Sequence, residues 1–190
     1  LDEEMDTPVV ARYPNLMKRY KDFTLKVNGG ELKQGQVMGI LGANAIGKTT
    51  FLKMLGGVEK PSEGEVEIKA KISYKPQYLS SDYAGDVRSL LSAASGGSLE
   101  SGLVQSEIVN PLSLNKLFDK NVASLSGGEL QKVAVSACLL TDAEVYFLDE
   151  PSAFIDVEDG ISLAKVIQKF VRSRGRSAMI VDHDVQLIDI

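Results

Sequence analysis

The segment Gly42-Ala43-Asn44-Ala45-Ile46-Gly47-Lys48-Thr49 fits the pattern G-x-x-x-x-G-K-[ST], which is typical of loops that bind nucleotide phosphates. A mostly apolar run, Gln36 to Leu41, precedes it and predicts a buried strand, and Lys48 to Leu55 follows it with apolar residues on one helical face. In such a loop the backbone N–H groups converge on the phosphates, and the helix N-terminus adds positive potential. A glycine-rich turn without a ligand would explain neither the lysine nor the hydroxyl residue. The segment therefore predicts a nucleotide-binding α/β fold.

The residue types in this loop also predict individual roles. Lys48 is expected to neutralise charge on the β- and γ-phosphates and so to contribute to catalysis, and the hydroxyl of Thr49 is expected to bind Mg²⁺. The residues expected to contact the nucleotide are Asn44, Ala45, Ile46, Gly47, Lys48, Thr49 and Thr50. The pattern indicates nucleotide binding but not what the energy is used for.

A second apolar run, Val145 to Leu148, ends in two carboxylates, Asp149 and Glu150. In a parallel sheet this strand end lies beside the phosphate loop, because ligands bind at the carboxyl ends of the strands. We expect Asp149 to hold Mg²⁺ through water and Glu150 to polarise an attacking water. An acidic pair at a strand end can also be a solvated turn, and the phosphate loop favours the functional interpretation.

Strands alternate with helices along the chain, which predicts a mostly parallel sheet covered by helices on both faces. Besides the runs above, strands are expected at Val9 to Tyr13, Phe23 to Val27, Glu65 to Ile68, Lys71 to Tyr74 and Ala178 to Val181, and helices at Gly128 to Leu140 and Ile161 to Val171. The stretch Ser80 to Lys120 is rich in serine, leucine and glycine and predicts an inserted helical subdomain. Residues 1–79 and 121–190 would then form the ATP-binding core with a small antiparallel β subdomain.

Composition excludes several classes of protein. The net charge of −5 argues against nucleic-acid binding by the whole surface, and no apolar stretch reaches the roughly 20 residues that span a bilayer. The single cysteine, Cys138, lies in an apolar run and predicts a buried thiol, with no disulfide and no iron–sulfur cluster in this chain. With no signal peptide, these features predict a cytoplasmic protein. Leu1 in place of methionine indicates an excerpt of a longer polypeptide.

The segment Leu125-Ser126-Gly127-Gly128-Glu129 lies between the phosphate loop and the acidic strand end. Alone it could be an ordinary helix cap with Ser126 as N-cap. In this order the three motifs resemble those of ABC ATPases, which implies a P-loop NTPase of the ABC ATPase type that binds ATP or ADP with Mg²⁺. The resemblance also implies that the N–H groups of Ser126, Gly127 and Gly128 contact the γ-phosphate held by a second cassette. Function would then require a pair of cassettes, in one polypeptide or as a homodimer.

The resemblance implies roles for further positions. Gln77 would contact Mg²⁺ and the water, His183 would hydrogen-bond the γ-phosphate, and the loop from Ser152 to Asp156 would contact the opposing cassette. Tyr13 would stack on adenine, although a core role on an edge strand is nearly as well supported.

A narrower resemblance rests on Tyr13-Pro14, Tyr74-Lys75-Pro76-Gln77-Tyr78, Leu125 to Val133, Asp149 to Glu158 and His183-Asp184-Val185. These segments are similar to the second cassette of the archaeal and eukaryotic ribosome-recycling ABC proteins, the RNase L inhibitor type of subfamily E. The resemblance implies a clamp that splits ribosomal subunits, with a ribosomal subunit as partner and no membrane. Two alternatives remain open: the ATPase subunit of an ABC membrane transporter, and an ATP-binding interaction module that does not hydrolyse ATP.

Three positions depart from the pattern of this family. Ala45 and Gly160 stand where the family has glycine and arginine, and Asp182 replaces a glutamate. The arginines at 172, 174 and 176 could contact ribosomal RNA, but a solvated helix end is the favoured interpretation.

Overall fold

The computed structural model describes residues 7–40, 45–66, 68, 70–75 and 82–182, with the main chain alone at 45 and 46. Its centre is a parallel sheet of four strands in the order β5-β8-β7-β6. The strands are β5 (Val37–Ile40), β6 (Ile72–Lys75), β7 (Val145–Asp149) and β8 (Ser177–Val181). The predicted parallel sheet is therefore confirmed.

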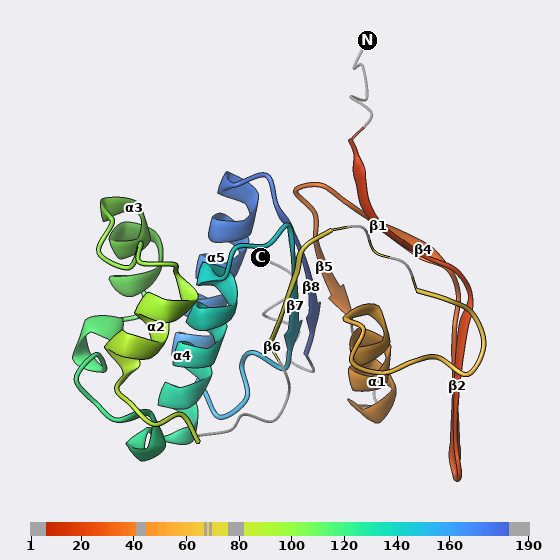
Figure 1. Cartoon of the computed structure of the whole chain (residues 1–190), viewed down its shortest axis with the longest axis horizontal. Coiled ribbons are helices and arrows are strands. Elements are labelled where there is room, and N and C mark those ends of the chain that lie inside the picture. The colour runs from red at the N-terminus through yellow and green to blue at the C-terminus, as the bar shows by residue number, and fades with distance from the viewer. Residues whose placement is uncertain (1–6, 41–44, 67, 69, 76–81, 183–190) are drawn as a thin grey trace.

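Helices cover both faces of this sheet (Figure 1). Helices α4 (Gly127–Leu140) and α5 (Val157–Ser173) lie on one face, and α1 (Ala45–Leu55) lies on the other. Side chains of β7 alternate between the two sides, with Tyr146 and Leu148 packed among the residues of α4 and α5, and Phe147 packed beside α1. Every residue of β7 and β8 is buried, which explains why these strands are apolar except for Asp149 and Ser177 at their ends.

An antiparallel part packs beyond α1. It consists of two strand pairs, β1 (Val9–Tyr13) with β4 (Gly30–Lys33) and β2 (Leu16–Tyr20) with β3 (Phe23–Val27). The prediction for 23–27 is confirmed, whereas β2 was missed because its Leu-Met-Lys-Arg-Tyr sequence shows no alternation of apolar and polar residues.

The strand predicted at 65–68 is wrong for the residues that the structure describes there. Glu65, Val66 and Ile68 belong to no strand, and the chain makes only an isolated bridge nearby, between Glu63 and Met17. Val66 and Ile68 instead pack against the core beside α1. These residues are apolar because they pack against the core, and not because they belong to a strand.

The segment predicted as a helical insertion contains helices, as expected. They are α2 (Val87–Ala94), α3 (Gly102–Val104), a π-helical turn (Gln105–Val109) and a 3₁₀ turn (Leu114–Lys116), and a second 3₁₀ turn (Val122–Ser124) follows just beyond the predicted segment. Their buried residues form one continuous core with α4 and α5. Whether the segment 80–120 forms a subdomain separate from the rest of the chain is not tested by the structure, so these boundaries stay a prediction.

Helix α5 begins earlier than predicted, because a polar side chain caps it upstream of the apolar residues. Asp156 accepts a hydrogen bond from the N–H of Asp159, so α5 begins at Val157 rather than at Ile161. Among the described residues, none of the helices combines the length and apolarity that a bilayer crossing requires.

Candidate nucleotide-binding site

The start of α1 and the end of β7 bring two predicted site residues together. The Thr49 hydroxyl donates to Oδ1 of Asp149 at 3.4 Å, although 100 positions separate the two residues in the chain. Lys48 and Thr50 are buried on the same helix. The parallel sheet causes this encounter, because its strands all end at one edge.

Asp149 is fully buried, and its Oδ2 has no hydrogen-bond partner among the described residues. Burial raises the pKa of this carboxyl to about 6, the bond from Thr49 opposes that shift, and the charge of Glu150 adds to it. A buried carboxylate oxygen without a partner is costly unless a cation compensates it. Hydroxyl and carboxylate oxygens are ligands that Mg²⁺ takes, so Thr49 and Asp149 fit this ion.

Glu150 leaves the strand in an unusual backbone conformation. Its φ is +47°, in the left-handed region that residues other than glycine rarely adopt. Its N–H donates to the carbonyl of Val181 at 2.6 Å, which joins the end of β7 to the end of β8. Non-glycine residues with such strain concentrate at functional sites.

Sequence reasoning missed Lys75, the last residue of β6. Its ammonium group donates to the main-chain carbonyls of Asp149 at 2.8 Å and Glu150 at 3.3 Å. Burial lowers the pKa of Lys75 to about 8, and the charges of Asp149 and Asp182 oppose this shift. The sequence signal that could have identified this residue is the lysine at the end of the half-apolar strand β6.

The N-terminus of α4 carries a capping box, as the simple helix-cap interpretation expects. The Glu129 N–H donates to the Ser126 hydroxyl at 3.2 Å, and the Ser126 N–H donates to the Glu129 carboxylate at 3.0 Å. Lys120 contacts the same carboxylate at 2.9 Å and lowers the pKa of Glu129. The first N–H groups of any helix have no acceptor within it, so this terminus can still bind an anion.

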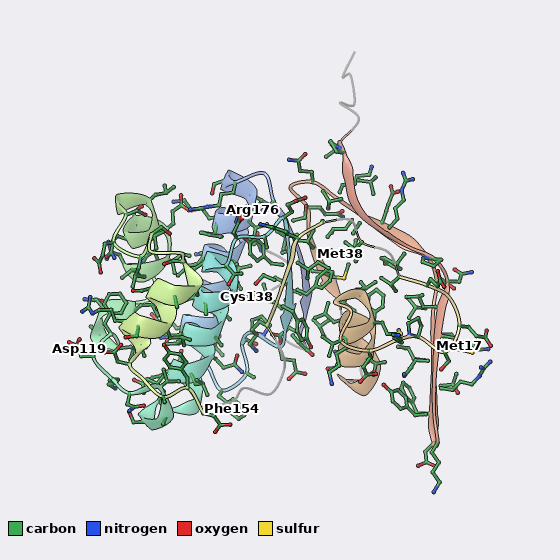
Figure 2. All side chains as sticks on the ribbon, viewed as in Figure 1. Met17, Met38, Asp119, Cys138, Phe154 and Arg176 are labelled. Carbon is green, nitrogen blue, oxygen red and sulfur yellow. The ribbon has the colours of Figure 1, made fainter. Side chains whose placement is uncertain are left out.

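The two glycines after Ser126 have a structural reason. A Cβ at Gly128 would lie 2.9 Å from the Phe154 carbonyl oxygen, and one at Gly127 would lie 3.2 Å from the Phe154 Cβ. Phe154 has a φ of +64° and is 82% exposed, and Figure 2 shows it at the N-terminal end of α4. Beside it the surface forms a hollow of about 410 Å³ whose lining includes Ser126 and Asp159.

The loop that carries Phe154 is anchored by Ser152 to Asp182, the residue that follows β8. The Ser152 hydroxyl donates to Oδ2 of Asp182 at 2.8 Å, and the Ser152 N–H donates to the same oxygen at 3.3 Å. Asp182 is fully buried, so the loop is anchored in the interior. Asp182 therefore anchors the loop, a role that the sequence did not indicate.

Two predicted nucleotide contacts have neighbours within the protein. Tyr13 packs edge-on against Phe51, with ring centroids 5.2 Å apart, and belongs to the rim of the core beside α1. This packing supports the core role, while stacking on adenine stays a prediction. The Thr50 hydroxyl lies 3.5 Å from that of Tyr20.

Several predicted residues lie outside the described part of the chain. These are Gln77, His183 and Asn44, together with the side chains of Ala45 and Ile46. Gly47 lies in the first turn of α1 and is buried. The roles assigned to all six stay predictions.

The expectation of a solvated helix end is wrong for Arg174 and Arg176, whereas Arg172 is exposed as expected. Arg174 pairs with Glu107 and Arg176 bonds to the hydroxyl of Tyr146, and their side chains are only 18% and 27% exposed. Arg172 donates to Gln168 at 3.0 Å. Their partners within the protein leave Arg174 and Arg176 less available to ribosomal RNA than Arg172.

The comparison with protein families agrees with the site. Residues 25–153, more than half of the chain, match the model of the ABC transporter family. The chain belongs to the ABC transporter family. The prediction of an ABC-type ATPase fold is thereby confirmed.

Relatives of this cassette include members of subfamily E. It is 50% identical over 184 residues to an uncharacterized ABC transporter ATP-binding protein of Methanocaldococcus jannaschii, covering 96% of this chain and 30% of the relative. It is 40% identical to translation initiation factor RLI1 of Saccharomyces cerevisiae, covering 90% and 28%. It is 37% identical to ABC transporter E family member 3 of Arabidopsis thaliana, covering 86% and 93%. The resemblance to subfamily E is confirmed, and the chain spans about a third of the length of the first two relatives.

Solved structures support the same relationship. A structure titled RNase-L Inhibitor matches this cassette with a TM-score of 0.93 and 46% identity, covering 98% of this chain and 36% of that one. An archaeal ribosome recycling factor bound to a ribosomal stalk protein also gives 0.93 and 46%, covering 100% and 37%. A metal-chelate type ABC transporter gives 0.78 with 23% identity, covering 96% and 77%, which shows the shared fold alone.

Proposed function

We propose that this cassette binds ATP with Mg²⁺ and hydrolyses it as one half of a clamp formed with a second cassette. The observation that carries the proposal is the meeting of Thr49, Asp149 and Glu150 at the edge of the sheet where α1 begins. The buried Oδ2 of Asp149, which has no hydrogen-bond partner among the described residues, supports a cation at this point.

The positions of the two helix N-termini support a second cassette. Helix α1 and helix α4 lie on opposite faces of the sheet (Figure 1), so the Ser126–Gly128 end of α4 is poorly placed to reach the phosphate loop of the same chain. The α4 terminus has no side chains at its two glycines and lies beside a hollow. A phosphate presented by another cassette would find backbone N–H groups there.

Within this arrangement each residue has a chemical task. Lys48 and the N–H groups of α1 bind the phosphates, Thr49 and Asp149 hold the metal, and Glu150 accepts a proton from the attacking water. Bound Mg²⁺ supplies neutralisation of charge on the phosphate oxygens. We assign Gln77 to the metal and water and His183 to the γ-phosphate, following the family pattern. Loss of the γ-phosphate would open the clamp.

The names of the relatives suggest which process the energy of ATP hydrolysis drives. They include a translation initiation factor, and one similar structure, with a TM-score of 0.91, is titled as ribosome-bound archaeal Pelota and ABCE1. We infer that the whole protein drives ribosome recycling in the cytoplasm, with a ribosomal subunit as partner. An ABC membrane transporter is the alternative, and co-purification with ribosomal subunits or with an integral-membrane protein separates the two.

Replacement of Glu150 tests the hydrolytic mechanism. Glu150→Gln should leave ATP affinity within about twofold of wild type and lower the rate of phosphate release by about 10²-fold or more, because only the proton acceptor is lost. Glu158→Gln, an exposed glutamate at the start of α5, is the matched control and should hydrolyse ATP normally. Unchanged hydrolysis by Glu150→Gln would refute its role as base.

Lys48→Ala tests nucleotide binding separately. Without this charge the phosphates lose their main cation, so tight binding of a fluorescent ATP analogue should disappear. Normal affinity would refute the assignment of the phosphate loop. This chain alone, without a second cassette, should hydrolyse ATP slowly.

A further inference from the structure

Lys75 is a buried charge that the mechanism above does not use. Lys75 is only 1% exposed, and its side chain is among the largest fully buried side chains of the described residues. It ends β6, opposite Leu148 in the register of the sheet. From there the ammonium group reaches past the end of β7 to the carbonyl oxygens of Asp149 and Glu150.

Burying an ammonium group is costly, and an apolar side chain of similar volume would fill the same space without that cost. Neither of these hydrogen bonds goes to a carboxylate, so Lys75 is not simply one half of an ion pair. The bonds join two consecutive peptide units at the place where the strand ends. Burial lowers the pKa of Lys75 to about 8, which is a measure of this cost.

The second of these carbonyls belongs to the strained residue. Glu150 has a φ of +47°, a conformation that is strained for residues other than glycine and persists only where its surroundings hold it. Its N–H is bound to Val181 of β8 at 2.6 Å, and its carbonyl is bound to Lys75 of β6 at 3.3 Å. Glu150 is thus held from both neighbouring strands.

We propose that Lys75 is a positioning residue that fixes the backbone of Glu150 so that its carboxylate is presented to the water attacking the γ-phosphate. The inference rests on the proposed role of Glu150 as base. Lys75 itself touches neither nucleotide nor water in this account. A proton acceptor works only within a narrow range of distance and angle, so loosening its peptide lowers the rate of chemistry rather than the affinity for ATP.

Lys75→Met in the intact protein that carries this cassette tests the proposal, because methionine fills the volume without N–H donors. We expect kcat for ATP hydrolysis to fall about tenfold to a hundredfold, while KM and the affinity for ATP stay within about twofold. Lys71→Met, four positions earlier and exposed, is the matched control and should leave kcat unchanged. A normal kcat for Lys75→Met, or an equal loss of affinity and rate, would overturn the proposal.

A second variant keeps the test decisive if Lys75→Met does not fold. Lys75→Gln retains two N–H donors on a shorter side chain that can reach one carbonyl, so kcat should lie between those of wild type and Glu150→Gln at unchanged KM. Wild-type turnover in this variant would contradict the proposal.

The double variant Lys75→Met with Glu150→Gln separates positioning from general stabilisation. If Lys75 acts through Glu150, the double variant should hydrolyse ATP no more slowly than Glu150→Gln alone, since coupled residues are not additive. Full additivity of the two losses would overturn the inference while leaving Glu150 as base. If Glu150→Gln alone hydrolyses normally, the proposed base fails and the role of Lys75 fails with it.

Discussion

Burial sets the ionisation of three side chains in and beside the central sheet. It raises the pKa of Asp149 to about 6 and that of Cys138 to about 12, and it lowers that of Lys75 to about 8. In each case the low-dielectric interior disfavours the charged form. Asp149 and Lys75 have proposed tasks that offset this cost, whereas Cys138 behaves as a small apolar residue that accepts a hydrogen bond from Ser73.

The buried state of Cys138 predicts low reactivity. It is the one cysteine of the chain, so a thiol reagent should report on this position alone. Ellman's reagent should modify the native protein only at the rate at which the structure opens, and the urea-unfolded chain at once. Rapid modification of the native protein would show that the thiol is accessible.

The same residue should contribute to the pH dependence of stability. The thiol has a pKa of about 12 when folded and about 8.5 when unfolded, so the unfolded chain loses its proton first as the pH rises. The free energy of unfolding should therefore fall above about pH 8.5. In Cys138→Ala this part of the fall should be absent in urea titrations at pH 8 to about 10. An identical pH profile in both proteins would contradict the shift.

At the scale of elements, the contact between α4 and the loop at 151–156 shapes the N-terminus of the helix. Gly127 and Gly128 allow Phe154 to approach the first turn of α4, while Ser126 and Glu129 close that turn with a capping box. Ser152 anchors the other part of the loop to Asp182. The loop and the helix terminus therefore form one surface, and a change in either alters both.

Two glycine substitutions make this contact measurable. In a helix, alanine is favoured over glycine by about 1 kcal/mol, and Gly160→Ala should be stabilising by up to this amount because nothing lies within 4 Å of the added Cβ. Gly128→Ala should instead destabilise the protein, because its Cβ would meet the Phe154 carbonyl at 2.9 Å and displace the loop. Urea unfolding measures both. Equal stabilisation by the two substitutions would show that the loop moves away without cost.

At the scale of the whole molecule, the central sheet joins two cores. Residues of β7 and β8 contribute alternately to the core with α4 and α5 and to the core with α1 and the antiparallel strands. The helices between residues 87 and 116 share the first of these cores and have none of their own. The cassette should therefore unfold as one unit, even if the predicted helical subdomain moves relative to the rest when ATP binds.

Hydrogen exchange across a urea series tests this expectation. Amides of Leu91 in α2 and of Phe147 in β7 should exchange through openings with similar free energies and similar urea dependence, because both side chains are buried in cores that meet at the sheet. A much lower opening energy confined to α2 would show that 80–120 is a separate folding unit.

Much of this protein follows from local sequence. The phosphate-loop pattern between a strand and a helix, the mostly apolar runs of β7 and β8 and the Ser126–Glu129 cap each carry their own signal, because each depends on residues close together in the chain. These signals were enough to predict the parallel sheet, the family and the pairing of the loop with the acidic strand end.

Other features exist only because the fold brings distant residues together. A lysine at a strand end can be noticed in the sequence, but its bonds to the peptides of Asp149 and Glu150, like the anchoring of Ser152 by Asp182, cannot be read from local sequence. The burial of Arg174 and Arg176 reversed the expectation from their charge, because Glu107 and Tyr146 lie opposite them in the fold. Local sequence determines which residues can form a strand, a cap or a phosphate loop, while tertiary contacts decide which buried charges are compensated and so which of them serve the chemistry.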